Sequence, residues 1–327
     1  MSSFRLVFSN GVVSRSSDTP PVATFLESHP GAYTTTRTHD NASCLLFWER
    51  HLRRLANSAR ILLNSKPRLL FKPYETTPHC SLSSFSIDPS VWISGIPSLV
   101  NDSMSKALKV ALRESRRSDG EELAVTALVS CDVEKFYGVQ DLDGERVDRV
   151  FDVNVHIGTY VPGLFGVEGN GAHLALVGYG REVAVAKYSD WVRLRKPLEK
   201  LRPPLVTELL LSNDGDHILE GCITNFFVVC QKDNSEAEGR YSHECNSTYS
   251  FEVQTAPISD GVLPGVIREL VIEVCLSEGI PIREIAPSWS KFEFWEEAFI
   301  TKLFQLQEAS VASLQLAPAD GWSDRGS

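Results

Sequence analysis

The stretch LEGCITNFFVV, residues 219–229, decides how this chain is interpreted. Its aromatic and β-branched residues predict a buried strand, yet it carries a carboxylate at Glu220, a glycine at Gly221 and an amide at Asn225. A purely structural strand would avoid all three, because buried polar groups need partners and glycine weakens a strand. The stretch therefore indicates a binding site, and the rest of the chain has to supply its other contacts.

Length and composition indicate a globular protein. The 327 residues are 43% hydrophobic and 23% charged, which predicts two domains. A net charge of −10 argues against a general nucleic-acid binder, which needs a basic face. Seven cysteines without a Cys-x-x-Cys pair favour a reducing compartment over a disulfide framework or a zinc site. No apolar run reaches the ~18 residues of a membrane span. We therefore expect a cytoplasmic protein, with organelle targeting as the weaker alternative.

The pattern of apolar residues predicts alternating blocks of helices and strands. Helices are expected over residues 49–63, 102–118 and about 264–279, and a hairpin is expected around Asn-Asp-Gly-Asp at 213–216. The segments ELAVTALVS, FDVNVHIGTYV, HLALVGYG, EVAVAKYS and part of FITKLFQLQEAS are expected to be strands. These blocks predict two α+β domains, one over residues 1–159 and the other over residues 160–327, with a cleft between them.

Two further segments carry groups that could react with a ligand or bind one. Lys187, in AVAKYSDW, follows an apolar run, and a partly desolvated lysine is a nucleophile toward carbonyls. A lysine in solvent at the end of a strand is the alternative. The loop with Gly261, Pro264 and Gly265 precedes a helix, so its N–H groups could bind a phosphate, although a plain helix cap has the same pattern.

A cofactor would explain these groups together. An ionised, partly buried Glu220 needs a cationic partner, and a protonated pyridine nitrogen is such a partner. Pyridoxal 5'-phosphate (PLP) requires a lysine for its aldehyde, an acid for its ring nitrogen and donors for its phosphate.

Several segments in order resemble the class IV, or fold-type IV, PLP-dependent aminotransferases, which include the branched-chain and D-amino-acid aminotransferases and aminodeoxychorismate lyase. EGCITNFFV is similar to the family's acidic signature, and Lys187 precedes Glu220 by 33 positions, a similar interval to the family's. SDGVLPGVIREL resembles the phosphate turn, GAYTTTRT the strand with a pocket tyrosine, and ERHLRRLANSA the helix with a phosphate-binding arginine.

This resemblance implies a fold and a set of roles. The fold is a homodimer-forming α+β enzyme with a smaller N-terminal domain and a larger β-rich C-terminal domain. The implied roles cover the cofactor aldehyde (Lys187), the ring nitrogen (Glu220), the turn beneath the ring (Thr224 and Asn225) and the phosphate (Arg54, Gly265, Val266 and Ile267). Asn225 could instead satisfy only local backbone groups.

The same resemblance places Tyr33 in the substrate pocket. Strand alternation puts Thr35 and Arg37 on the face of Tyr33, where Arg37 could bind a substrate carboxylate. A structural salt bridge is the alternative for Arg37.

The sequence also departs from the family pattern. Ile267 stands where relatives often have threonine, and Thr301, Lys302 and Leu303 occupy a segment that often supplies small or hydroxyl residues. Three functions therefore stay open: an aminotransferase acting on a small amine or amino acid and a keto acid, a PLP-dependent lyase, and a non-catalytic binding or assembly subunit. The presence of both Lys187 and Glu220 favours the first.

Overall fold

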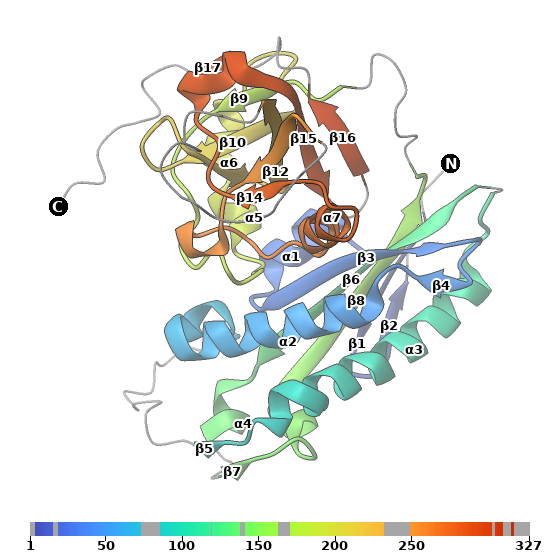
Figure 1. Ribbon diagram of the computed structural model, residues 1–327. Helices are drawn as coiled ribbons and strands as arrows, with labels where there is room; N and C mark the ends of the chain where they lie inside the picture. Colours follow the sequence, from blue (N-terminus) through green and yellow to red (C-terminus); the bar gives the residue numbers. More distant parts are fainter. Residues whose placement is uncertain are drawn as a thin grey trace. The chain divides into compact units, whose positions relative to one another are not determined.

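The computed structural model divides the chain into two compact units (Figure 1). It describes residues 4–15, 19–72, 86–118, 120–137, 141–162, 171–231, 249–302, 305–309 and 315–316. The N-terminal unit comprises Met1–Pro162 and Val185–Leu194, and the C-terminal unit comprises Gly163–Ala184 and Arg195–Ser327. Lys187 therefore lies in a short segment that belongs to the N-terminal unit.

The N-terminal unit is built on a six-stranded sheet in the order β2-β1-β8-β6-β3-β4, with antiparallel pairing throughout. Its strands are β1 (Arg5–Ser9), β2 (Val12–Arg15), β3 (Ala32–His39), β4 (Cys44–Leu45), β6 (Glu122–Cys131) and β8 (Phe151–Tyr160). The predicted strands at ELAVTALVS and FDVNVHIGTYV are thus confirmed as β6 and β8.

Two long helices cover this sheet, α2 (Trp48–Ser65) against β3 and α3 (Ile96–Glu114) against β8 (Figure 1). The predicted helix over residues 49–63 is confirmed as α2, whose apolar stripe is buried, with Leu52, Leu55, Ala59 and Leu62 all at most 2% exposed. The unit's smaller elements are α1 (Val22–Ser28), η1 (Pro67–Leu69), β5 (Ser86–Ile87), η3 (Val91–Gly95), α4 (Val133–Tyr137), β7 (Asp141–Leu142), η4 (Val147–Arg149) and α5 (Trp191–Leu194).

The C-terminal unit is β-rich. Its nine-stranded sheet has the path β14-β13-β12-β11-β10-β9-β17, and β15 pairs with both β12 and β16. The strands are β9 (Leu174–Leu176), β10 (Glu208–Ser212), β11 (Ile218–Gly221), β12 (Asn225–Gln231), β13 (Phe251–Thr255), β14 (Ile282–Glu284), β15 (Trp295–Lys302), β16 (Gln305–Ala309) and β17 (Gln315–Leu316). The helical elements are α6 (Lys196–Lys200), η6 (Ile258–Asp260), α7 (Val266–Ser277) and η7 (Trp289–Phe294). Mixed helix and sheet in this arrangement fits the predicted α+β fold.

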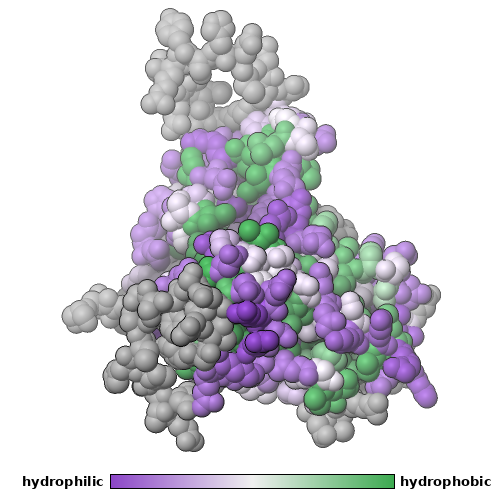
Figure 2. Space-filling model, turned by 90° about the horizontal axis from the view of Figure 1, so that it is seen from below, coloured by the Kyte–Doolittle hydropathy of each residue, from purple (hydrophilic) through white to green (hydrophobic). Residues whose placement is uncertain are grey.

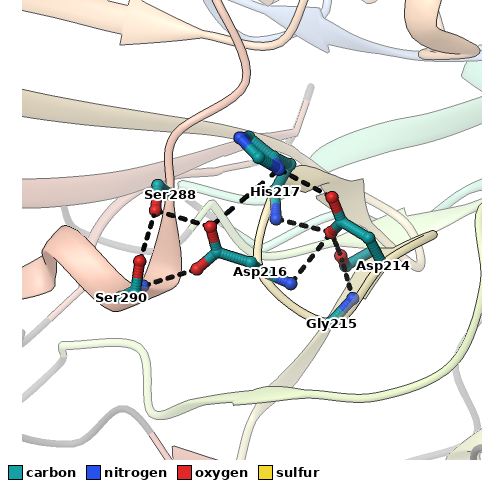
Figure 3. Close-up of polar contacts among 7 residues, drawn as sticks. Asp214, Gly215, Asp216, His217, Ser288 and Ser290 are labelled. Carbon is teal, nitrogen blue, oxygen red and sulfur yellow. Dashed lines mark hydrogen bonds and ion pairs between the residues drawn. The ribbon is translucent and has the colours of Figure 1, made fainter.

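The predicted hairpin joins β10 to β11, and its turn is closed by side chains (Figure 3). Oδ1 of Asp214 accepts hydrogen bonds from the backbone N–H groups of Asp216 and His217 at 2.9 and 2.8 Å. Asp216 in turn accepts bonds from the Ser288 hydroxyl and the Ser290 N–H, both at 2.7 Å. These contacts fix the turn that leads into the strand carrying Glu220.

One predicted strand is wrong. Residues 182–186, in the segment EVAVAKYS, form a turn and a bend, and Val183 has a left-handed φ of 54°. The alternating apolar residues favour a strand locally, but the carbonyl of Ala184 accepts a hydrogen bond from the Arg181 guanidinium. A side chain thereby replaces the neighbouring strand as the partner of this backbone.

Hydrophilic residues cover much of the face in Figure 2, with scattered hydrophobic patches among them. Within the described residues, no helix combines the length and the apolar character needed to cross a membrane.

Candidate functional site

Backbone hydrogen bonds fix the segment of Lys187 to β3 and α2. The carbonyl of Lys187 accepts a 3.0 Å bond from the N–H of Tyr33, and its own N–H donates to the Ser58 hydroxyl at 3.1 Å. The N–H of Ser189 donates to the carbonyl of Gly31 at 2.9 Å. Lys187 is half-buried rather than a solvated lysine at a strand end.

The amine of Lys187 lies over the ring of Tyr33, with Nζ 4.9 Å from the ring centroid. Tyr33 is itself buried. The predicted pocket tyrosine and the predicted nucleophile are therefore neighbours inside the N-terminal unit, although 154 positions separate them in the sequence (187 − 33). A ring face next to the amine attracts its charged form and restricts where Nζ can point.

The other two predicted pocket residues lie further along β3. The hydroxyl of Thr35 is 3.3 Å from that of Thr126 on β6, and Arg37 Nη1 donates to the carbonyl of Thr38 at 3.2 Å. Among the described residues, Arg37 forms no ion pair, and its buried Nε has no hydrogen-bond partner. The structural salt bridge considered for Arg37 is thus absent from this part of the chain.

Arg54 meets the opposite face of β3. Its Nη2 donates to the Thr34 hydroxyl at 2.9 Å, and Thr34 Oγ1 lies 2.7 Å from Nδ1 of His51. Because Arg54 only donates, the Thr34 proton is available for His51 Nδ1. Burial, followed by the charges of Arg54 and Lys187, lowers the pKa of His51 from 6.5 to about 2, so the imidazole is neutral.

The acid of the signature is held in the C-terminal unit. Glu220 is 1% exposed, and its Oε1 accepts a 2.9 Å hydrogen bond from Nε of the buried Arg181. Its Oε2 accepts a 2.9 Å bond from the N–H of Leu263, in the loop before α7. The two oxygens thus connect β11 with two other segments of the chain.

The amide and the glycines of the signature join the same loop. Asn225, paired with Glu220 across β11 and β12, donates through Nδ2 to the carbonyl of Leu263 at 3.0 Å. A Cβ at Gly265 would lie 2.1 Å from Asn225 Oδ1, and one at Gly221 would lie 2.1 Å from Thr224 Oγ1. Both glycines are therefore required by close approach. Asn225 therefore binds a backbone group of the loop before α7, 38 positions away in the sequence.

Helix α7 begins at Val266, with Gly265 as its N-cap. Val266 is buried and Ile267 is half-buried. The first N–H groups of a helix lack intrahelical acceptors, which gives this turn the capacity to bind an anion. Leu303, the other residue at which the sequence departs from the family pattern, lies outside the described residues.

Thr301, which the sequence offers in a segment that often supplies hydroxyl residues, faces Asn225 across β12 and β15. Its hydroxyl is buried without a partner among the described residues. Other residues of the site were not predicted from the sequence. Arg181 and His51 contact predicted residues from positions that no local motif distinguishes. The buried Arg268 donates to the carbonyl of Ala256 and to Glu284, so its charge serves to fix α7.

Residues 201–302 match the family model described as "Amino-transferase class IV". None of the curated protein sequences matches the chain.

Solved structures show the same fold. The branched-chain aminotransferase of Thermoproteus uzoniensis, with norvaline, is 16% identical at a TM-score of 0.57, covering 99% of this chain and 90% of that one. A fold IV transaminase of Curtobacterium pusillum is 14% identical, with a TM-score of 0.58, and the match covers 97% of this chain and 95% of that one. The branched-chain amino acid aminotransferase of Escherichia coli is 16% identical, with a TM-score of 0.56, and the match covers 95% of this chain and 85% of that one. The predicted fold is confirmed.

Proposed function

We propose that the chain is a PLP-dependent transaminase of the class IV type, a proposal supported by the match of residues 201–302 and by the fold. Its substrates would be an amino acid or other small amine and a keto acid. The observation that carries the proposal is the half-buried Lys187, whose Nζ lies over the ring of Tyr33.

The residues present fit PLP. Lys187 supplies an amine in restricted surroundings, and each Glu220 oxygen has one described donor although a carboxylate oxygen accepts two bonds. Gly221 and Gly265 admit Thr224 Oγ1 and Asn225 Oδ1 to positions that a Cβ would exclude, so the signature and the loop before α7 pack closely beside Glu220. The buried hydroxyl of Thr301 has no partner within the described residues, as expected of a donor reserved for a bound anion.

The predicted roles are divided between the two units. In the N-terminal unit, Lys187 would bind the aldehyde, Arg54 the phosphate, and Tyr33, Thr35 and Arg37 the substrate. In the C-terminal unit, Glu220 would contact the ring nitrogen, Thr224 and Asn225 would hold the turn, and Gly265, Val266 and Ile267 would offer N–H groups to the phosphate. These assignments remain predictions.

When bound, PLP supplies an aldehyde for the substrate amine and a ring that accepts electrons from the α-carbon. Lys187 would hold the cofactor until the substrate amine displaces it. Its freed amine would then take the proton from the substrate α-carbon and deliver it to the cofactor carbon that carries the nitrogen. Glu220 would accept the ring N–H, and Arg37 would orient the substrate carboxylate.

A visible absorption spectrum of the purified protein, scanned against a panel of amino acids, tests this function. We expect a PLP band that changes with an amino donor, and transfer of labelled nitrogen to an added keto acid. Release of a keto acid without nitrogen transfer would favour the lyase alternative. A protein that binds no PLP would support a non-catalytic role. The homodimer and the cytoplasmic location remain predictions, which sedimentation and cell fractionation would test.

A further inference from the structure

Arg181 and Glu220 form a buried ion pair in the C-terminal unit. The Nε–Oε1 distance is 2.9 Å, and the side chains are 4% and 1% exposed. Burying two charges is costly unless their geometry is good and their other polar atoms are bonded. Arg181 also donates through Nη2 to the carbonyl of Ala184 at 3.0 Å.

The carboxylate of Glu220 is held on both of its oxygens. The guanidinium of Arg181 contacts Oε1, and the N–H of Leu263 contacts Oε2 at 2.9 Å. Charge-assisted bonds from an arginine and a backbone amide both stabilise the ionised form. The orientation of this carboxylate is therefore fixed by two contacts within the C-terminal unit.

We propose that Arg181 is a positioning residue that acts through Glu220, holding its carboxylate ionised and in place for the ring nitrogen of PLP. This role rests on the proposed function. Arg181 contacts Glu220 directly, whereas a ring nitrogen bound to Glu220 would lie further from the guanidinium. Because electrostatic energy falls with distance, the charge of Arg181 stabilises the carboxylate more than it repels a proton on that nitrogen. Arg181 thus favours the arrangement in which Glu220 is charged and the ring nitrogen carries the proton.

The same guanidinium fixes the path of the chain toward Lys187. Its bond to Ala184 closes the turn at 182–186, three positions before Lys187. The left-handed φ of 54° at Val183, unfavourable for a β-branched residue, belongs to this turn. Loss of Arg181 would thus remove both the counter-charge of the acid and a constraint on the segment that leads to the lysine.

The first test is a double-variant cycle on the cofactor-free protein, using Arg181→Met, Glu220→Gln and the two combined. Arg181→Met leaves a buried carboxylate without its counter-ion, so it should lower the melting temperature more than the combined change does. Arg193→Met is the matched control. Its ion pair with Asp190 is exposed, and its loss should change the melting temperature little.

The second test follows PLP itself. Arg181→Met should weaken PLP binding at least about tenfold in titrations of the cofactor-free protein, a factor equivalent to ~1.4 kcal/mol. With ¹⁵N-labelled PLP, the NMR shift of the ring nitrogen should move toward the unprotonated value in Arg181→Met. Arg181→Lys should restore it partly, because a charge returns without the planar fork. A merely structural role would not move this signal.

The outcomes separate the role of Arg181 from the proposed function. If the wild-type protein binds PLP, and Arg181→Met leaves both the PLP affinity and the ring-nitrogen shift unchanged, the proposed role of Arg181 is overturned and the proposed function stands. Wild-type protein that binds no PLP would overturn the proposed function and this role with it. Should Arg181→Met fail to fold, Arg181→Lys carries the same two measurements.

Discussion

Arg54 donates a 2.9 Å hydrogen bond to the hydroxyl of Thr34, which lies 2.7 Å from Nδ1 of the buried His51. Thr34 and Tyr33 are adjacent on β3, so their side chains point to opposite faces of the strand. The partner of the predicted phosphate ligand and the tyrosine beside the predicted nucleophile are thus neighbours on one strand, and Lys187 also contacts α2 through Ser58. Arg54 is held by the protein before any anion binds, which reduces the entropy that binding would cost.

Arg54→Ala should weaken PLP affinity at least about tenfold. A charge-assisted hydrogen bond contributes about 1.5–3 kcal/mol, and a tenfold change corresponds to ~1.4. The neighbouring Arg53 is exposed while Arg54 is half-buried, so Arg53→Ala is a matched control that should retain wild-type affinity. Titration of the cofactor-free proteins with PLP makes the comparison. Equal affinities of wild type and Arg54→Ala would place the phosphate elsewhere.

His51 should make stability depend on pH. Its pKa is lowered to about 2 in the folded protein by burial and by the charges of Arg54 and Lys187. A depressed folded pKa gives stability that is present above the unfolded value, near 6.5, and is lost as pH falls below it. Each pH unit below 6.5 should therefore remove about 1.4 kcal/mol from the unfolding free energy, or roughly 2 kcal/mol by pH 5.

The variant His51→Asn removes the titrating group while keeping an acceptor near the position of Nδ1. Urea unfolding at pH 7 and pH 5 should show a smaller loss for His51→Asn than for wild type. His173→Asn, at an exposed histidine, should behave like wild type. If the unfolding free energies of wild type and His51→Asn fall in parallel with pH, His51 gains its proton in the folded protein as readily as in the unfolded chain, and the prediction is wrong.

Lys187→Ala should abolish both the visible band of lysine-bound PLP and all turnover. Its amine is half-buried over Tyr33, whereas Lys200 is exposed, so Lys200→Ala should retain both properties. Borohydride reduction followed by peptide mapping should place the cofactor on the peptide that contains Lys187. A Lys187→Ala protein with an unchanged spectrum would assign the covalent bond to another lysine.

Local patterns were sufficient for the regular elements. The stripe of α2, the hairpin around 213–216 and the start of α7 each depend on residues a few positions apart, where helix period, turn chemistry and capping act. The strand predicted over EVAVAKYS failed because Arg181, which also forms a long-range ion pair with Glu220, donates a hydrogen bond to the carbonyl of Ala184. Arg181 lies 39 positions from Glu220, and no periodicity connects the two residues. The bonds that tie Lys187 to Tyr33 and Ser58 span 154 and 129 positions, so the association of that segment with the N-terminal unit was not predictable.

Glu208→Gln should stabilise the protein above neutral pH. Burial raises the pKa of Glu208 to about 7, despite the bond from the Leu209 N–H and the charges of Lys302 and Arg195. A raised folded pKa means that stability is full below the unfolded value, near 4.5, and is lost as pH rises through 7. The loss for wild type by pH 8 should be roughly 3 kcal/mol. Chemical unfolding at pH 5 and pH 8 measures it, and Glu199→Gln is the more exposed control. A wild-type curve that is flat over this range would contradict the raised pKa.

Gly265→Ala should disturb the loop before α7 through contact alone. Gly265 has an ordinary φ of −72°, so alanine meets no backbone strain there. Its Cβ would nevertheless lie 2.1 Å from Asn225 Oδ1, and Asn225 could not move without lengthening its 3.0 Å bond to the carbonyl of Leu263. Overpacking of this kind costs about 1–3 kcal/mol.

Gly158→Ala is the control for that substitution, because its Cβ would meet its nearest neighbour at 3.6 Å, an ordinary contact. Gly158→Ala should therefore unfold close to wild type, whereas Gly265→Ala should unfold at lower denaturant. Gly265→Ala should also bind PLP more weakly, since Leu263 positions Glu220 through its N–H and Asn225 through its carbonyl. Should Gly265→Ala lose stability but keep full PLP affinity, the loop would support the fold without shaping the phosphate and ring-nitrogen contacts. Should it lose neither, Asn225 would have a second rotamer that preserves the loop, and its amide would not be required there.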